Sequence, residues 1–225
     1  MSEIIRTIIT TEDGSPSLYD PQLGETYHSR HGAIQESTHV FIQAGLDHRQ
    51  THSLRALTVL EIGFGTGLNA ALAIQHALDK EYPLHLASIE KYPLTAEEQT
   101  AFLAHSNEHI RPALQKVLEA PWGQDTSINT LIQLTKIQGD ATVVQLPACD
   151  VLFLDAFAPA VCPELWTPEM MVKYADCLRL GGILVTYSAK GEVRRAMEAA
   201  GLQTERLAGP PGKREMLRAT KISTP

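Results

Sequence analysis

The sequence lacks any long hydrophobic run, because no apolar stretch approaches the roughly 20 residues that a membrane-spanning helix requires. Its N-terminal segment, residues 1–15, carries acidic side chains early and has no continuous apolar core, so it does not resemble a secretory signal peptide. Cysteine is scarce, and Cys149, Cys162 and Cys177 show no C-x-x-C spacing. These absences argue against a disulfide framework, and we expect a cytoplasmic protein with reduced thiols.

A surplus of positive charge is missing as well, since the formal net charge is −7. This argues against a broadly basic nucleic-acid-binding protein. The charge is uneven, however: residues 190–221 contain 8 Lys or Arg and 4 Asp or Glu, a local charge of +4 that leaves −11 for the rest of the chain. Such a basic C-terminal stretch can contact phosphate groups, or it can be the solvated face of a helix and two strands.

Metal-binding and hydrolase motifs are also missing. His48 with His52, and His105 with His109, have a spacing that can hold a metal on one helix face, but neither pair carries the Glu of H-E-x-x-H and no third ligand is evident. No Gly-x-Ser-x-Gly segment or Cys/His pair indicates a hydrolase. We expect no bound metal, and surface positions for these histidines.

What is present divides into two zones. Residues 1–50 carry turn signals, Asp13-Gly14-Ser15-Pro16 and His31-Gly32, around short β-prone runs such as Ile4–Thr10, with a possible short helix at Glu36–Ala44. We expect a small β-rich N-terminal extension packed on the core, and a single main domain over residues 51–225.

Strand and helix patterns alternate through the main domain, which predicts an α/β fold with a mostly parallel, doubly wound sheet. The region 105–130 is polar, less regular and helical in part. The helix that starts at Pro168 is expected to end before Gly181. The expected strands are Ala56–Ile62, Leu84–Glu90, Leu131–Gln138, Cys149–Asp155 and Ile183–Ser188. The expected helices are Leu68–Leu78, one from Thr95, one from Pro168, and one along Val193, Met197 and Ala200. A closing antiparallel hairpin is expected from Leu202–Leu207 and Glu215–Lys221.

The strongest local signal is Glu61-Ile-Gly63-Phe-Gly65-Thr-Gly67, between a buried strand and a helix. Alternate glycines let the backbone turn tightly and approach a ligand, while the helix N-terminus favours a carboxylate or phosphate. The spacing differs from the dinucleotide pattern G-x-G-x-x-G, because position 68 is leucine. It is similar to the first motif of Rossmann-like methyltransferases, although glycine-rich turns also occur without ligands.

Acidic residues end the neighbouring strands: Glu90, Asp140 and Asp155. Ligands of open α/β sheets bind beyond the carboxyl ends of the strands, so we expect these acids and Glu61 to face one crevice. Glu90 is placed to accept both ribose hydroxyls, and Asp140 to accept an adenine amino group. The alternatives are a water-facing acid for Glu90 and a loop-stabilising or N-cap acid for Asp155.

Longer segments carry a family resemblance that covers residues 17–221. They are Glu25-Thr26-Tyr27-His28-Ser29 with Gly32, Glu36 and Val40-Phe41; Glu61–Asn69; Glu90-Lys91-Tyr92-Pro93-Leu94; Phe153–Pro159; Pro163-Glu164-Leu165-Trp166-Thr167-Pro168-Glu169; and Lys213-Arg214-Glu215-Met216-Leu217. Together they resemble the methyltransferase half of the bifunctional MnmC enzymes and its stand-alone relatives, the tRNA 5-(methylaminomethyl)-2-thiouridine methyltransferases. The region 105–130 resembles that pattern less.

The resemblance implies a Rossmann-like class I methyltransferase that transfers a methyl group from S-adenosyl-L-methionine to the 5-aminomethyl nitrogen of the wobble (2-thio)uridine of tRNA. It also implies that the FAD-dependent oxidase activity of the bifunctional enzymes is absent here, because no second dinucleotide loop follows within the 225 residues. The substrate is then the aminomethyl form. Which tRNAs are used and the oligomeric state stay open.

The resemblance, together with the acids at the ends of the strands, implies which residues form the site. Asp155 is expected to orient the amine and accept its proton. Tyr27 is expected to cover the cofactor or reach the nucleobase. Further cofactor-binding residues are Glu61, Gly63, Gly65, Gly67, Asn69, Glu90, Lys91, Asp140 and Ala141, and Asp155 is expected to contact the cofactor too. Phe157 and Pro159 wall the substrate pocket, and the residues that position tRNA phosphates are Lys190, Arg194, Arg195, Lys213 and Arg214.

Two other functions remain open at this point. One is a small-molecule N-methyltransferase or aminopropyltransferase on the same fold, which the acidic body of the protein favours. The other is a non-catalytic module that binds the cofactor, which the four intact acids disfavour.

Overall fold

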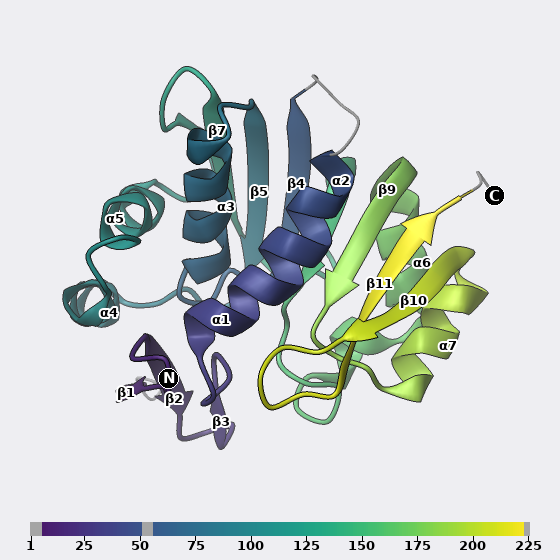
Figure 1. Cartoon of the computed structure of the whole chain (residues 1–225), viewed down its shortest axis with the longest axis horizontal. Helices are drawn as coiled ribbons and strands as arrows, with labels where there is room; N and C mark the ends of the chain where they lie inside the picture. Colours follow the sequence, from purple (N-terminus) through teal and green to yellow (C-terminus); the bar gives the residue numbers. More distant parts are fainter. Residues whose placement is uncertain (1–5, 51–55, 223–225) are drawn as a thin grey trace.

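The computed structural model describes residues 6–50 and 56–222 (Figure 1). Ile4 and Ile5 of the first expected strand, and His52, lie outside the described residues. The strands are β1 (Thr7–Thr10), β2 (Pro16–Asp20), β3 (Glu25–Thr26), β4 (Leu57–Ile62), β5 (Leu84–Glu90), β6 (Asp125–Ser127), β7 (Ile132–Gln138), β8 (Cys149–Leu154), β9 (Leu178–Thr186), β10 (Leu202–Ala208) and β11 (Glu215–Lys221).

The helices are α1 (Ala33–Ser37), the π-helix η1 (Thr38–Asp47), α2 (His48–Gln50), α3 (Leu68–Asp79), α4 (Ala96–His105), α5 (Arg111–Glu119), the 3₁₀-helix η2 (Pro163–Trp166), α6 (Pro168–Cys177) and α7 (Gly191–Ala199).

The main sheet has the order β10-β11-β9-β8-β4-β5-β7-β6. The five strands from β9 to β7 are mutually parallel, while β11 pairs antiparallel with β9 and with β10. This confirms the expected mostly parallel sheet with a closing hairpin. The chain runs from β4 through α3 to β5 in one direction and from β8 through α6 to β9 in the other. The C-terminal ends of β4 and β8 therefore form the topological switch point where open α/β sheets bind ligands.

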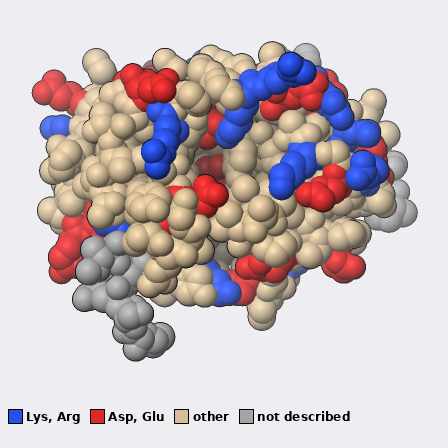
Figure 2. All heavy atoms as spheres, turned by 90° about the horizontal axis from the view of Figure 1, so that it is seen from below, with Lys and Arg blue, Asp and Glu red and all other residues tan. Residues whose placement is uncertain are grey.

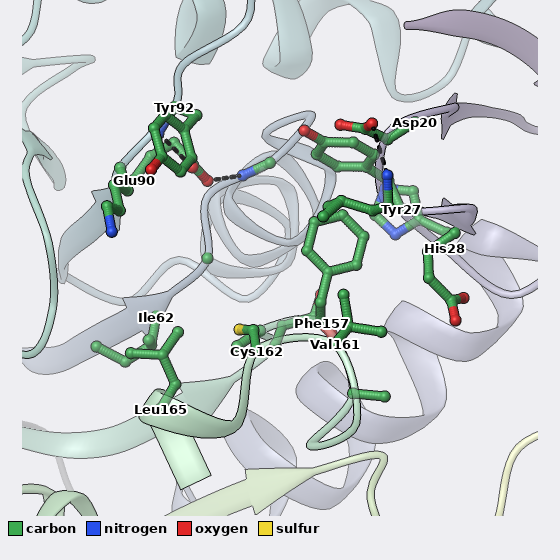
Figure 3. Close-up of a pocket in the computed structure, with 18 of the residues that line it drawn as sticks. Asp20, Tyr27, His28, Ile62, Glu90, Tyr92, Phe157, Val161, Cys162 and Leu165 are labelled. Carbon is green, nitrogen blue, oxygen red and sulfur yellow. Dashed lines mark hydrogen bonds between the residues drawn. The ribbon is translucent and has the colours of Figure 1, made fainter. Parts of the chain in front are cut away.

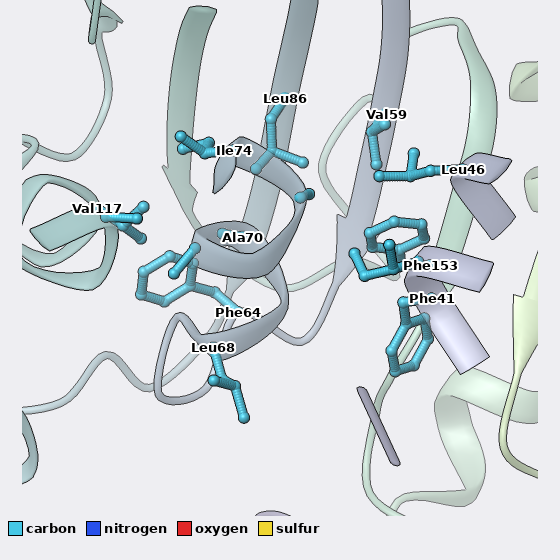
Figure 4. Packing of buried hydrophobic residues seen from close by; sticks show 14 of the residues in the cluster. Phe41, Leu46, Val59, Phe64, Leu68, Ala70, Ile74, Leu86, Val117 and Phe153 are labelled. Carbon is cyan, nitrogen blue, oxygen red and sulfur yellow. The ribbon is translucent and has the colours of Figure 1, made fainter. Parts of the chain in front are cut away.

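Apolar side chains on both faces of the central strands explain why the sheet is sandwiched between helices. All six residues of β8 are buried. Val59 and Phe153 belong to the cluster that packs against η1, α3 and α5, shown in Figure 4. Leu60 and Leu154 belong to the cluster that packs against α6 and α7. Burial on two faces is the reason the strands read as continuous apolar runs.

The N-terminal extension contains a three-stranded antiparallel sheet, as expected, but its helical part is longer than the expected Glu36–Ala44. The helix runs through α1, η1 and α2 and packs on the main sheet. At Gly45 an added Cβ would lie 3.2 Å from Cε1 of Phe153, so a larger residue here would require that ring to shift. At the other end, Arg6 donates to Glu98 of α4 over 2.8 Å. We propose that the boundary between the N-terminal extension and the main domain lies near residue 50.

Helix α6 ends at Cys177, before Gly181 as expected, but both bounds of the following strand differ from expectation. Strand β9 begins at Leu178 and ends at Thr186, whereas the sequence predicts a strand at Ile183–Ser188. The reason is pairing: Leu178 lies opposite Cys149 of β8, and the register shifts before Ile183. Gly181, with a φ of 73°, is therefore a turn inside an irregular strand and not the stop after a helix.

Within residues 105–130, α5 confirms the partial helix, with Leu114 and Val117 buried against α3. Throughout residues 6–50 and 56–222, every helix falls short of the length and apolar character that crossing a bilayer requires.

Candidate active site

A cavity of about 600 Å³ opens at the carboxyl end of the parallel strands. Its walls come from the segments that follow β4, β5, β7, β8 and β9, together with the N-terminal extension and the β10–β11 loop. Figure 2 looks onto this edge and shows acidic side chains in and around a central hollow. The size suits a ligand of nucleotide dimensions.

The glycine loop, residues 63–67, forms one wall of the cavity. At two of its glycines the structure leaves no room for a side chain. Gly63 has a φ of 92°, and an added Cβ there would lie 2.6 Å from the carbonyl oxygen of Asp155. Gly65 has a φ of 52°, and an added Cβ would lie 3.1 Å from the ring of Tyr27. The loop therefore presents bare backbone to the cavity under the Tyr27 ring. Gly67 does not line the cavity; it turns the chain into α3, where a Cβ would lie 2.9 Å from Phe64.

Glu90 lies at the end of β5 with its carboxylate fixed by two backbone groups. The N–H of Gly65 donates to Oε2 over 2.9 Å, and the N–H of Tyr92 donates to Oε1 over 2.8 Å (Figure 3). Each carboxylate oxygen keeps a further lone pair for a ligand in the cavity. This fixed, half-buried acceptor pair fits the two adjacent hydroxyls of a ribose.

Asp140 and Lys91 form a pair across the same end of the cavity, with 2.9 Å between Oδ2 and Nζ. The hydroxyl and backbone N–H of Thr142 both donate to Oδ1 of Asp140. These hydrogen bonds, Thr142 first and then Lys91, lower the pKa of Asp140 to about 2. Asp140 is therefore a firmly ionised acceptor beside the backbone of Ala141, where an adenine amino group can donate.

Lys173 of α6 holds the loop after β7 in place. Its Nζ donates to the carbonyl oxygens of Ala141, Thr142 and Val144 over 2.9, 3.0 and 2.8 Å. Three charge-assisted hydrogen bonds to one short loop fix the backbone beside Asp140. Sequence reasoning missed this lysine, because nothing in its neighbourhood distinguishes it from a solvated helix position.

Asp155 is partly buried, and Nδ2 of Asn69 donates to its Oδ2 over 2.7 Å. Burial raises the pKa of Asp155 to about 7, against the opposing effect of Asn69; the charge of Glu36 raises it further and that of Lys213 lowers it. Its side chain lines the cavity directly beyond β8. A carboxyl group with a pKa near neutrality suits proton transfer at physiological pH.

Glu61 does not face the cavity, contrary to the expectation that it joins the other acids there. It is fully buried beneath the glycine loop, and the hydroxyl of Ser88 donates to Oε2 over 2.5 Å. Burial raises its pKa to about 8. The reason is the alternation of side chains along β4, which turns Glu61 toward α3 together with Val59. Asn69 holds Asp155 through its hydrogen bond, and neither Glu61 nor Asn69 lines the cavity.

The opposite end of the cavity combines Tyr27 and Phe157, which sequence reasoning assigned, with residues that it did not assign. Tyr27 packs edge-to-face on Phe157 with 5.1 Å between ring centroids. The hydroxyl of Tyr187 donates to the carbonyl oxygen of Ala156 over 2.8 Å. His28 is buried, with its Nε2 2.8 Å from Oγ1 of Thr66.

Burial lowers the pKa of His28 to about 4, so that this ring is neutral. His28, Glu36, Cys162, Leu165 and Tyr187 all line the cavity. The motif segments that carry the family resemblance already contained His28, Glu36 and Leu165, and these could have been assigned.

The predicted phosphate-binding residues separate into three groups. Lys190 and Arg214 lie with Pro159 along a shallow groove of about 410 Å³ that adjoins the cavity. Lys213 lines both the groove and the cavity and is paired with Glu36. Arg194 pairs with Glu198 over 2.6 Å on α7, and neither Arg194 nor Arg195 lines the groove or the cavity.

Among the described residues, no group of three or more His, Cys, Asp or Glu side chains has an arrangement that could hold a metal ion.

Comparison with known proteins agrees with this geometry. The model of a family described as S-adenosyl-L-methionine-dependent methyltransferase matches residues 104–222. The tRNA 5-methylaminomethyl-2-thiouridine biosynthesis bifunctional protein MnmC of Burkholderia mallei (strain SAVP1) is 33% identical over 230 aligned positions, which cover 94% of this chain and 34% of that protein. MnmC of Methylobacillus flagellatus is 32% identical, covering 91% of this chain and 33% of that protein. The chain thus spans about a third of the length of these relatives.

Solved structures share the fold. The crystal structure of MNMC2 from Aquifex aeolicus has a TM-score of 0.83 and 27% identity, covering all of this chain and 73% of that one. CalS10 of Micromonospora echinaspora, an amino pentose methyltransferase with S-adenosyl-L-methionine bound, has a TM-score of 0.51 at 13% identity, covering 85% of this chain and 93% of that one. The second likeness concerns the fold alone.

Proposed function

Because this chain belongs to a family of S-adenosyl-L-methionine-dependent methyltransferases, we propose that it methylates the 5-aminomethyl nitrogen of the wobble (2-thio)uridine of tRNA. The observation that carries the proposal is Asp155, a partly buried carboxyl group with a pKa raised to about 7 that lines the cavity beside the glycine loop. Such a group can take a proton from a substrate amine. The names of the MnmC relatives supply the choice of substrate.

The cavity residues fit S-adenosyl-L-methionine, which supplies a methyl group on a positively charged sulfur atom. We assign Glu90 to the ribose hydroxyls, and Asp140 with the backbone of Ala141 to the adenine. The bare backbone at Gly63 and Gly65 then lies along the methionine part. Lys91 keeps Asp140 in place through their ion pair.

In the proposed reaction the enzyme's own residues hold the amine and remove its proton. An alkylammonium ion has no lone pair, so the amine must lose a proton before it can attack. Asp155 is placed to accept that proton, directly or through water, and Asn69 fixes its orientation. Tyr27 and Phe157 wall this part of the cavity, and holding the reactants in line supplies several kcal/mol of rate acceleration.

We propose that tRNA approaches over the groove beside the cavity. In Figure 2 most of the Lys and Arg side chains in view lie to one side of the hollow, mixed with acids. Lys190 and Arg214 line the groove, so they are the members of the predicted basic set that are best placed to contact phosphates next to a flipped-out wobble base. A tRNA substrate also assigns the reaction to the cytoplasm.

If these two side chains contact phosphates, the variant Lys190→Ala with Arg214→Ala will show a weaker dependence of tRNA affinity on salt. Each lost phosphate contact lowers the slope of log affinity against log salt by roughly 0.7–0.9. The matched control is Arg194→Ala with Arg195→Ala, because both arginines lie outside the groove. Filter binding at several salt concentrations gives both slopes. An unchanged slope in the groove variant together with a reduced slope in the control variant would move the tRNA contact to α7.

The proposed activity is tested with purified protein, S-adenosyl-L-methionine and tRNA whose wobble uridine carries the 5-aminomethyl group. Nucleoside analysis should then detect 5-methylaminomethyl-(2-thio)uridine, and none with tRNA that lacks the aminomethyl group. The acidic net charge of −7 favours a second candidate, a small-molecule N-methyltransferase. Methylation of free primary amines with no methylation of tRNA would establish that candidate and reject ours.

A further inference from the structure

Lys213 belongs to the basic C-terminal stretch but lies in the wall of the reaction cavity. Its Nζ forms an ion pair with Oε2 of Glu36 and lies 4.0 Å from the centroid of the Tyr187 ring. The side chain of Glu36 is only 9% exposed and that of Lys213 is 32% exposed. The pair therefore connects α1 of the extension with the β10–β11 loop at the substrate end of the cavity.

The backbone around Lys213 is fixed, which limits how far the ammonium group can move. Its N–H donates to the carbonyl oxygen of Pro210 over 2.9 Å. Gly212 lies so close to the ring of His31 that an added Cβ would overlap that ring. His39 contacts the carbonyl oxygen of Ala208 over 2.8 Å. The loop is thus held against the extension at two positions that precede Lys213, Ala208 and Gly212.

The charge of Lys213 acts on the group proposed to accept the proton. Lys213 lowers the pKa of Asp155 and Glu36 raises it, so both charges are within electrostatic reach of that carboxyl group. An amine that contacts Asp155 comes under the same two influences. A neighbouring cation lowers the pKa of an amine and a neighbouring anion raises it, most strongly where water is excluded.

We propose that Lys213 determines the charge state of the substrate nitrogen, by disfavouring its protonated form, and that Glu36 sets the strength of this effect. The inference rests on the proposed function. The ammonium proton passes to the carboxylate of Asp155, and the freed lone pair forms the N–C bond. The S–C bond breaks at the same time and its electron pair stays on sulfur.

Several charged and titratable groups lie around Lys213, among them its chain neighbours Arg214 and Glu215 in the groove and His31 beside Gly212. Glu36 approaches from α1, Tyr187 follows β9, Asp155 follows β8, and neutral His28 comes from the extension. Lys190 lies along the adjoining groove. Among these described groups, Glu36 is the one that forms a salt bridge with the Lys213 ammonium. Substitutions at Lys213 and at Glu36 should therefore change the charge state of the substrate nitrogen in opposite directions.

The test is the pH dependence of single-turnover methylation. Lys213→Met should move the ascending limb of the profile to higher pH by about 1 unit. At a fixed pH below the limb, this shift makes the rate about tenfold slower than that of wild type. Glu36→Gln should move it to lower pH. Lys213→Arg and the double variant Glu36→Gln with Lys213→Met should stay near wild type. The control is Lys116→Met, on the exposed face of α5 away from the cavity.

A binding measurement gives a second readout. With S-adenosylhomocysteine present, the affinity of wild type for an anticodon stem-loop carrying 5-aminomethyluridine should increase from pH 6 to pH 8. Lys213→Met should weaken that increase, and a 5-hydroxymethyluridine stem-loop should show none in either protein. Equal loss of rate at every pH in both single variants, with unmoved limbs, would overturn the inference. Failure of wild type to methylate the tRNA would instead reject the proposed function and this inference with it.

Discussion

Asp155→Asn is expected to fold and to bind S-adenosyl-L-methionine as wild type does, while methyl transfer slows by roughly 100-fold or more. The amide keeps the size of the carboxyl group, but it cannot accept a proton as a carboxylate does. Because the pKa of Asp155 is raised to about 7, the wild-type rate should increase as the pH rises through about 7. The variant should lose the part of this increase that comes from the ionisation of Asp155. Single-turnover methylation across pH measures both effects.

The alternative role for Asp155 is to stabilise the loop after β8. In that case the variant should lose about 1 kcal/mol of stability and keep its rate, since this is the usual cost of a lost cap or loop hydrogen bond. Thermal unfolding and single-turnover kinetics separate the two roles, because each role changes a different measurement. A stable variant that methylates aminomethyl-uridine tRNA at the wild-type rate would remove Asp155 from the chemistry.

Glu61→Gln is expected to stabilise the protein at alkaline pH. Burial raises the pKa of Glu61 from 4.5 to about 8, so the folded state keeps a proton that the unfolded state has released over this interval. Stability associated with the neutral acid is therefore complete below about pH 4.5 and is lost as the pH rises to about 8. Glutamine keeps the uncharged shape, and the gain over wild type at pH 9 should be roughly 2–4 kcal/mol.

Urea unfolding at pH 5 and at pH 9 tests this expectation, with Glu119→Gln on the exposed side of α5 as the control. Wild type and Glu61→Gln should have similar stability at pH 5 and differ at pH 9. Asp155 contributes a further decrease through about pH 7 in both proteins. A Glu61→Gln protein that is less stable than wild type at both pH values would mean that the ionised carboxylate is the form the fold requires.

The sequence by itself determined the sheet and the edge of it at which the cavity opens. A mainly apolar run such as Cys149–Leu154 predicts a strand buried on both faces, and parallel strands bring their carboxyl ends to one edge. Glu90, Asp140 and Asp155 meet at the cavity for that reason. These positions follow from periodicity and connection rules that act over short stretches of chain.

Only the tertiary structure decided which side chains share the substrate end. Glu36 and Lys213 are 177 positions apart, and nothing local indicates that they pair. The alternation along β4 turned Glu61 away from the cavity, because one residue of register reverses the face. Lys213 entered the cavity while Arg194, in the same basic stretch, paired with Glu198 on the surface. The charge pattern is the same for both residues, but burial and the nearest partner depend on how distant segments pack.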